Sequence, residues 1–465
     1  RRVEGSRSGI SLRNIPRDTI ITQVGLQKPG PLVRDPAHSI EVDYFLRFQR
    51  HHAQVFPEYM TMLTTSMTLI FSTKKNCRMY DAPILQLETI MPGLLSDIDP
   101  DGLLEFSVVF TDRSLNHMSV KFQQVMNDIS TTMKQVYNAT SVAVVPGGGT
   151  FGMEAVARQF ATGKKCLVIR NGFFSYRWSQ ILEMGDIPTS HTVLKAKRTG
   201  EGKEAPFAPA AIDEVCETIR SEKPEVVFAP HVETASGIIL PDDYIRRVAD
   251  ATHEVGGLFV LDCIASGTIW VDMHSQAVDV LISAPQKGWS ASPCSALVML
   301  SSAARERIDS TTSTSFAADL KKWLQIMEAY ESGGHAYHAT MPTDSLTVFR
   351  NTMKETEAYG FDKLKKQQQE LGARVRARLA EKGIRSVAAE GFEAPGVVVS
   401  YTSDTNIQNG KAFLDAGLQI AAGVPLQCDE GDDYQSFRLG LFGLEKLGNI
   451  ERTLDTLESA LNKII

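Results

Sequence analysis

Short apolar, β-branched runs recur along the chain from about residue 84, and amphipathic stretches lie between most of them. The runs predict buried strands, while stretches such as MEAVARQFA and DDYIRRVADATHEVG have the periodicity of helices. Strands that alternate with helices favour an α/β fold, in which helices cover both faces of a mostly parallel sheet. The apolar runs are SVAVVP (141–146), KCLVIRNG (165–172), EVVFAPHVE (225–233), LFVLDCIAS (258–266), DVLISAP (279–285) and SALVMLS (295–301).

The last of these runs is expected to differ in direction from the others. Only a short connection separates 279–285 from 295–301. A crossover between parallel strands needs about a dozen residues or more. We therefore predict that 295–301 runs antiparallel to its neighbour.

The C-terminal part of the chain has a different pattern. Long helical patterns occupy 316–331 and 347–383. Leu454, Leu457 and Leu461 then share one face of a closing helix. Between these helices we expect strands at APGVVVSY (394–401), LQIAAGV (418–424) and SFRLGLF (436–442). The pattern predicts a large domain over 84–345 and a smaller α+β domain over 346–465.

Residues 1–83 form an atypical N-terminal extension. The Arg/Ser-rich start is compatible with a transit peptide or with a disordered or artificially added tail. The stretch MTMLTTSMTLIF (60–71) is compatible with a surface helix or strand, and a cleaved signal core is a minor alternative. No apolar run reaches the ~18 residues of a membrane span. We expect a cytoplasmic protein, or a mitochondrial one if the start is a transit peptide.

Composition narrows the function classes. The 465 residues are 43% hydrophobic and 22% charged, with a net charge of −7, which offers no support for nucleic-acid binding. The six cysteines lie far apart without a C-x-x-C pair, so neither a disulfide scaffold nor a zinc site is expected. The histidines show no HExxH pattern, which argues against a metal-dependent enzyme.

Two polar residues follow neighbouring predicted strands. Asp262 closes the apolar run LFVLD, and ligands of open α/β sheets bind outside the carboxyl ends of strands. Lys287 follows the next strand among Pro285, Gly288 and Trp289, and such crowding lowers the pKa of an amine. Taken singly, Asp262 could be a helix cap or part of an ion pair, and Lys287 a surface lysine. Together they match a carboxylate and an amine at opposite ends of a pyridoxal ring.

A glycine-rich turn, VVPGGGTFGMEA, lies between a predicted strand and a helix that should begin at about Thr150 or Phe151. Glycines allow the backbone to approach a ligand, and the free N–H groups of the first helical turn bind phosphate. The turn is neither a P-loop, since GK[ST] is absent, nor a clear dinucleotide fingerprint.

The order of the motifs along the chain resembles that of the class V aminotransferases. The motifs are this turn, an aromatic after the next strand, HVETASG, LDCIAS, SAPQKG and a late FRLG. The similarity covers about 84–465 and is strongest to the alanine–glyoxylate and serine–pyruvate (serine–glyoxylate) group. It implies the pyridoxal-phosphate fold type I, with one antiparallel strand and a smaller C-terminal α+β domain. It also implies pyridoxal 5'-phosphate as cofactor and transamination between a small amino acid and a 2-oxo acid such as glyoxylate or pyruvate.

The resemblance assigns roles around the cofactor. Lys287 would carry it as a Schiff base and move the substrate's Cα proton, and Asp262 would keep the pyridine nitrogen protonated. Phe174 would stack on the ring, since it stands where the family usually has Trp, although a core Phe is the alternative. The resemblance places the remaining contacts at Gly149, Thr150, Phe151 and Gln286 for the phosphate and at Thr234 for the phenolic oxygen.

Three more residues complete the implied site. Tyr337 and Thr340, in HAYHATMP, match a segment that reaches the phosphate in the partner subunit, which implies a homodimer with shared active sites. Arg438, in SFRLGLFG, matches the arginine that binds the substrate carboxylate, since a guanidinium makes a bidentate pair with a carboxylate. An interdomain salt bridge is the alternative for Arg438.

Departures from the family pattern leave the substrate open. His117-Met118-Ser119 with Phe122 replaces a usual His-Arg-Ser segment, and Met91-Pro92-Gly93-Leu94 replaces Pro-Gly-Pro. Transamination of 2-aminoethylphosphonate with pyruvate is therefore an alternative.

Two further alternatives keep the fold but change the function. A same-fold lyase or cysteine desulfurase would need a mobile cysteine, for which Cys428 is the nearest candidate, and would typically have histidines at the positions of Gln286 and Phe174. A non-catalytic binding protein would have no need to retain Lys287, Asp262 and Arg438 together.

Overall fold

A computed structural model describes residues 98–465 of the chain. The expectations for the extension 1–83, including its stretch 60–71, and for Met91-Pro92-Gly93-Leu94 lie outside these residues. None of the helices over 98–465 is long and apolar enough to cross a membrane.

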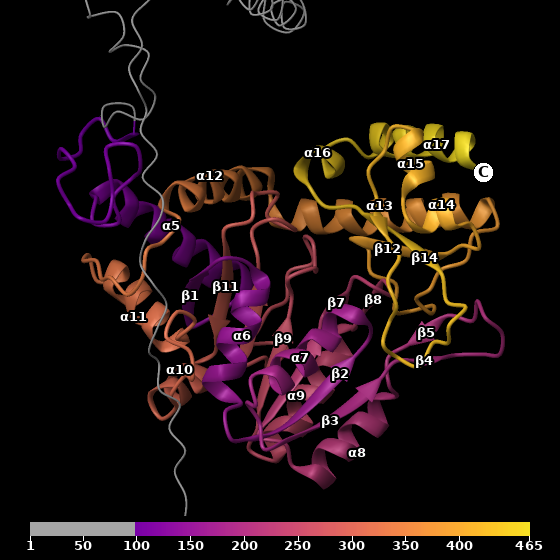
Figure 1. The fold of residues 1–465 in the computed structure, drawn as a ribbon, viewed down its shortest axis with the longest axis horizontal. Coiled ribbons are helices and arrows are strands. Elements are labelled where there is room, and N and C mark those ends of the chain that lie inside the picture. Colours follow the sequence, from indigo (N-terminus) through magenta and orange to yellow (C-terminus); the bar gives the residue numbers. More distant parts are fainter. Residues whose placement is uncertain (1–97) are drawn as a thin grey trace, which may run out of the picture. The chain divides into compact units, whose positions relative to one another are not determined.

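The centre of the described part is a seven-stranded sheet of order β1-β11-β10-β9-β6-β2-β3 (Figure 1). Strands β10, β9, β6, β2 and β3 run parallel, while β11 is antiparallel to both β1 and β10, as the short connection before it predicted. The sheet is therefore the mostly parallel one expected. Its strands are β1 (Ser141–Pro146), β2 (Lys165–Arg170), β3 (Ser190–Lys195), β6 (Val226–Pro230), β9 (Leu258–Asp262), β10 (Val280–Ser283) and β11 (Ser295–Leu300).

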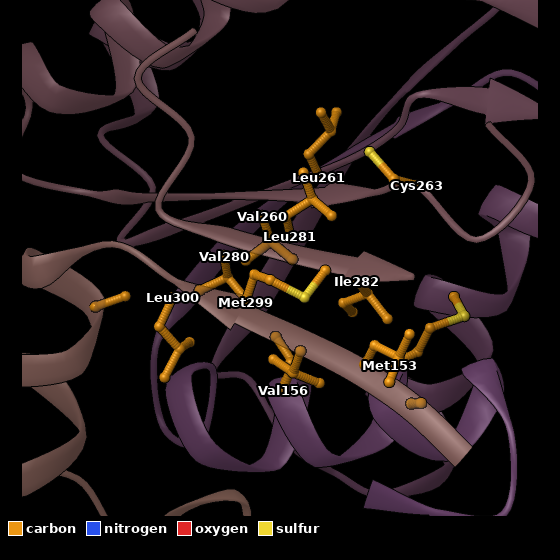
Figure 2. Close-up of a cluster of buried hydrophobic side chains, with 14 of the residues drawn as sticks. Met153, Val156, Val260, Leu261, Cys263, Val280, Leu281, Ile282, Met299 and Leu300 are labelled. Atoms are coloured by element: carbon orange, nitrogen blue, oxygen red, sulfur yellow. The ribbon is translucent and has the colours of Figure 1, made fainter. Parts of the chain in front are cut away.

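Helices cover this sheet. Every residue of β6, β9, β10 and β11 is buried, which requires cover on both faces. Figure 2 shows Met153 and Val156 of α6 among the apolar side chains of β9, β10 and β11. The helices of this part are α5 (Val120–Tyr137), α6 (Gly149–Phe160), α7 (Phe173–Met184), α8 (Ile212–Glu222), α9 (Asp242–Glu254), α10 (Ser302–Asp309) and α11 (Leu320–Glu331).

A second, antiparallel sheet of order β12-β14-β13 follows near the C-terminus. It packs with helices around a separate apolar cluster that includes Leu454, Leu457 and Leu461, so the amphipathic face predicted for the last helix is buried. The elements are α12 (Thr343–Tyr359), α13 (Phe361–Glu381), β12 (Val397–Tyr401), α14 (Thr405–Gln408), α15 (Lys411–Asp415), β13 (Ala421–Ala422), β14 (Ser436–Gly440), α16 (Leu444–Leu447) and α17 (Ile450–Ile464). The domain boundary at 345/346 stays a prediction.

Two features differ from the sequence pattern. The edge strand β3 was not predicted, because Ser190–Lys195 is only partly buried and carries no continuous apolar run. The helical pattern over 347–383 is two helices, since Gly360 at φ 103° separates α12 from α13. Two short two-stranded sheets complete the strands of residues 98–465. One pairs β4 (Lys197–Arg198) with β5 (Phe207–Ala208), and the other pairs β7 (Val232–Glu233) with β8 (Ile238–Ile239).

Candidate active site

A cavity of about 830 Å³ is lined by residues that follow β1, β2, β6, β9 and β10, and by residues of β14, α16 and α17. The carboxyl ends of these five sheet strands lie at one edge, because β1, although separated from β10 by β11, runs in the same direction as β10. The predicted site residues that line this cavity are Gly149, Thr150, Phe174, Thr234, Asp262, Gln286, Lys287 and Arg438.

Asp262 is the last residue of β9 and its carboxyl lies at the cavity wall. The backbone N–H of Ile264 donates to its Oδ1 at 2.9 Å. Burial nevertheless raises the pKa of the Asp262 carboxyl to about 7, and the nearby carboxylate of Glu233 acts in the same direction. A positively charged group next to the Asp262 carboxyl would lower its pKa again and favour the ionised carboxylate.

Lys287 lies in the turn after β10 and reaches the same cavity. Its Nζ lies 5.4 Å from the ring centroid of Phe442, and it forms no ion pair within residues 98–465. Burial lowers the pKa of the Lys287 amine, and the charges of Arg438 and Arg177 lower it further. A larger fraction of this amine is therefore neutral, and nucleophilic, at neutral pH.

The position of Lys287 depends on a close contact between two backbones. A Cβ placed on Gly288 would come within 2.0 Å of the Gly267 carbonyl oxygen. Trp289, the next residue, is fully buried and its ring packs 4.8 Å from that of Trp270. The turn that carries the lysine is thus held on both sides by rigid groups.

The glycine-rich turn leads into α6 as predicted, although the helix begins at Gly149 rather than at Thr150 or Phe151. Gly148 is its N-cap, no side chain caps the helix, and its first turn contains no acidic residue. A Cβ on Gly149 would lie 2.5 Å from Ile264 Cδ1, so a larger residue here would displace the Ile264 side chain where α6 approaches the turn after Asp262. This helix start opens onto the cavity with backbone N–H groups available to an anion.

Helix α7 brings two side chains to the cavity. Phe174 lies in its first turn, and the guanidinium of Arg177 lies over the Phe174 ring at 4.6 Å from the centroid. Arg177 Nη1 also donates to Thr150 Oγ1 at 3.3 Å. Arg177 therefore links the aromatic of α7 to the helix start of α6.

The fully buried carboxylate of Glu233 holds the start of α7 in place. It accepts hydrogen bonds from the backbone N–H groups of Phe174 (3.2 Å) and Ser175 (2.8 Å) and from the Ser175 hydroxyl (2.7 Å). A carboxylate is favourable at this helix N-terminus. Glu233 thereby fixes the backbone that carries Phe174.

Arg438 enters the cavity from β14, opposite the sheet edge. Its Nε donates to the Ala422 carbonyl at 2.8 Å and its Nη1 lies 3.5 Å from the Thr234 carbonyl oxygen. Within 98–465 it has no carboxylate partner, so the interdomain salt bridge considered as its alternative role is not formed there. The remaining guanidinium N–H groups are available to a carboxylate ligand.

Three predicted residues do not line this cavity. The Phe151 side chain is exposed and its ring lies against Gly147. Tyr337 is exposed, and its hydroxyl lies 3.1 Å from Thr340 Oγ1. The implied roles of Tyr337 and Thr340 concern a partner subunit, so their position outside this protomer's cavity agrees with that expectation without testing it.

The sequence pattern did not single out Arg177, Glu233, Ile264 or Phe442. A signal existed for two of them. Arg177 follows Phe174 by three residues in a helix, which places both on one face, and Glu233 is an acid inside the HVETASG segment. Ile264 and Phe442 are apolar residues in loops, and only the packing reveals them.

Comparison with known proteins identifies the family. The family model described as aminotransferase class-V matches residues 105–428. The chain belongs to the class V aminotransferases. The fold type I predicted from the motifs is thereby confirmed, and so are aminotransferase activity and pyridoxal phosphate as the cofactor of this chain.

Individual relatives of this class V aminotransferase are distant. The small subunit of a soluble hydrogenase from Synechococcus sp. is 24% identical over 356 residues, covering 75% of this chain and 88% of the relative. Alanine–glyoxylate aminotransferase of Rattus norvegicus is 24% identical over 359 residues, covering 75% and 82%. The crystal structure of an alanine–glyoxylate aminotransferase from Nostoc sp. has a TM-score of 0.64 at 19% identity, covering 84% of this chain and 98% of that one.

The site of this class V aminotransferase fits its cofactor by the chemistry of its groups. A buried carboxyl, a buried amine of lowered pKa and an uncapped glycine-rich helix start all open onto one cavity. Gln286 Oε1 is buried and has no hydrogen-bond partner within 98–465, so it is free to accept from a ligand donor, whereas a phosphate would be bound by the donor Nε2 of the same amide. These are complements to a pyridine nitrogen, an aldehyde carbon and a phosphate.

Proposed function

We propose that the chain transfers an amino group between a small amino acid of the alanine or serine type and a 2-oxo acid such as glyoxylate or pyruvate. The supporting observation is that Asp262, Lys287 and the start of α6 line one cavity, with the guanidinium of Arg438 facing them from β14. Relatives named alanine–glyoxylate aminotransferases support the substrate class.

Each chain residue has a proposed task. Pyridoxal phosphate, when bound, supplies an electrophilic aldehyde and a ring that withdraws electrons from the substrate's Cα. Lys287 would hold the aldehyde carbon. Once the substrate's amino group has displaced it, the free Lys287 amine would accept the proton of the substrate's Cα and deliver it to the former aldehyde carbon. Asp262 keeps the pyridine nitrogen protonated, and Phe174 holds the plane of the ring. Thr234 donates to the phenolic oxygen.

The remaining residues bind phosphate and substrate. The phosphate is held by the backbone N–H groups of Gly149 and Thr150, by the Thr150 hydroxyl and by Gln286. The N–H of Phe151, which was also expected to bind phosphate, already donates to the Gly148 carbonyl at 2.9 Å. Arg438 binds the α-carboxylate in a bidentate pair, which fixes the Cα–H bond that faces Lys287.

A change of the cofactor's visible absorbance tests this function. Alanine or serine added to the holoenzyme should convert the band in a single turnover and release one oxo acid per site, and glyoxylate or pyruvate should restore it. Lys287→Ala should slow turnover at least ~100-fold. If only 2-aminoethylphosphonate converts the band, the alternative phosphonate substrate replaces the small amino acid.

Cysteine desulfuration is a poorer fit to the described residues. Cys428 is buried and does not line the cavity. Its Sγ lies 3.5 Å from the Arg170 carbonyl oxygen. Burial raises the pKa of the Cys428 thiol to about 12, which disfavours the thiolate. Release of sulfide from cysteine by the holoenzyme at a rate comparable to transamination would overturn this assignment.

We also propose a homodimer in which Tyr337 and Thr340 reach the phosphate site of the partner subunit. Large apolar side chains near the start of the described chain, Leu103, Phe106 and Val108, are exposed, as expected for surfaces that a second copy covers. The Tyr337 ring packs on His117 at 5.5 Å between centroids.

A cytoplasmic location is the proposal for the chain, with the mitochondrion as the alternative if residues 1–83 include a transit peptide.

A further inference from the structure

We propose that Arg177 is the cation that binds the cofactor's phosphate, so that this site selects pyridoxal phosphate over unphosphorylated pyridoxal. The inference rests on the proposed cofactor site and adds a residue to it. Its basis is the position of one guanidinium between the start of α6 and the aromatic of α7.

The position of Arg177 is defined by two contacts. Its Nη1 lies 3.3 Å from Thr150 Oγ1, in the first turn of α6, and the guanidinium carbon lies 4.6 Å from the Phe174 ring centroid. Arg177 also lines the cavity that contains Asp262 and Lys287. The guanidinium is thus beside the proposed phosphate site and is oriented by stacking on a ring.

The charge of Arg177 is not neutralised by the described protein. Arg158 and Arg246, also on helices, pair with carboxylates four residues away at 2.7 and 2.9 Å. Arg177 has no carboxylate within 4.0 Å among residues 98–465. Its charge lowers the pKa of both Asp262 and Lys287, so its field extends across the cavity.

The start of α6 needs such a cation. Phosphate monoesters carry about −1.5 to −2 charges at neutral pH, whereas a helix N-terminus offers roughly half a positive charge. The first turn of α6 has no basic side chain of its own, because its residues are Gly149, Thr150, Phe151 and Gly152. Arg438 is held by the carbonyls of Ala422 and Thr234, and the amine of Lys287 is assigned to the aldehyde.

A rival role for Arg177 is to bind a second carboxylate of the substrate. Both roles use a guanidinium and an oxyanion, so activity alone does not separate them. They differ in whether Arg177 acts before any substrate is present, and binding of the cofactor to the apoenzyme therefore distinguishes them.

The test measures dissociation constants of pyridoxal phosphate and pyridoxal for apoenzyme in a Lys287→Ala background, where neither forms a covalent bond. Quenching of tryptophan fluorescence reports binding, since buried Trp289 lies two residues from position 287. Arg177→Gln should weaken binding of pyridoxal phosphate about 10–100-fold and that of pyridoxal less than about twofold. Arg177→Lys, which keeps the charge but loses the planar fork, should be intermediate.

Arg452→Gln is the matched control, since Arg452 lines the same cavity from α17. It should leave the ratio of the two dissociation constants unchanged. Equal weakening of both ligands by Arg177→Gln would show a packing role on Phe174 and overturn the proposal, as would unchanged binding of pyridoxal phosphate. If the chain with Arg177 intact binds neither ligand, the proposed cofactor site fails as well. If that chain binds both ligands and the Arg177 variants bind them with the same dissociation constants, only this inference fails.

Discussion

Asp262 and Lys287 follow neighbouring parallel strands that are in register. Asp262, the last residue of β9, pairs with Ile282 of β10, and Lys287 lies in the turn immediately beyond that strand. A buried carboxyl and a buried amine thereby reach one cavity from adjacent strand ends. Because the register fixes their spacing, we expect changes at either position to affect the same ligand.

The first prediction concerns the pH dependence of stability in the cofactor-free protein. Burial raises the pKa of Asp262 from 3.8 to about 7, so the folded state binds a proton that the unfolded state releases. The free energy of unfolding should therefore fall as pH rises from about 4 to about 7, and Asp262→Asn should remove this contribution. Urea titrations of both proteins across this range measure the difference. Parallel pH profiles would contradict the assigned pKa.

A matched control for this prediction is Asp455→Asn. Asp455 is exposed on α17 and forms no ion pair within the described residues. Its pH profile of unfolding should follow that of the wild type. In the holoenzyme, Asp262→Asn should in addition lower turnover by about 10²–10³-fold, because the counter-charge of the ring nitrogen is lost.

The second prediction separates substrate binding from cofactor binding. Arg438→Lys loses the planar fork and the hydrogen bond from Nε to the Ala422 carbonyl. KM for the amino acid should rise about 10–100-fold while the dissociation constant of pyridoxal phosphate stays within about twofold. Steady-state kinetics and an absorbance titration measure the two quantities. A parallel loss of cofactor affinity would place Arg438 in the cofactor site instead.

The third prediction tests the turn that carries the lysine. A Cβ at Gly288 would lie 2.0 Å from the Gly267 carbonyl oxygen, so one of the two backbones would have to shift, and a shift of Gly288 moves the adjacent Lys287. Gly288→Ala should cost about 1–3 kcal/mol of unfolding free energy. Gly334→Ala is the control, because its nearest contact, the Ala329 carbonyl oxygen, is at an ordinary 3.5 Å. Equal melting temperatures for the two variants would refute the close contact.

The fourth prediction tests shared active sites by complementation. Lys287→Ala and the double variant Tyr337→Ala/Thr340→Ala should each be slow as homodimers. After subunit exchange, half of the dimers are mixed and each has one intact site, so about a quarter of wild-type activity should return. Ion-exchange chromatography of subunits that carry differently charged tags verifies that mixed dimers form. Mixed dimers without recovered activity would show that Tyr337 and Thr340 act within their own protomer, and a double variant as fast as wild type would show that they have no role.

Local patterns were sufficient for most of the large sheet. The direction of β11 followed from the length of the connection before it, and the buried strands followed from continuous apolar runs. The edge strand β3 did not, because half-buried Ser190–Lys195 mixes polar and apolar residues. The break at Gly360 was also missed, since one glycine in a helical pattern does not by itself reveal a positive φ.

The site divides in the same way. Asp262 and Lys287 could be predicted because each follows an apolar run, and Gly149 because it belongs to a glycine-rich turn. Arg177 and Glu233 act through contacts between segments far apart in sequence, with Thr150 and with the backbone of α7. The spacing of Arg177 from Phe174 predicts one shared helix face, but the contacts with Thr150 and with the backbone of α7 depend on how separate segments pack, which the local pattern does not encode.

Borohydride reduction of the yellow holoenzyme, followed by proteolysis and mass spectrometry, tests the central claim most directly. A Schiff base to Lys287 predicts that one pyridoxyl-phosphate group per chain becomes fixed to the peptide that contains Lys287, and that Lys287→Ala remains unlabelled. Label on another lysine, or equal labelling of the variant, would contradict the assignment of Lys287.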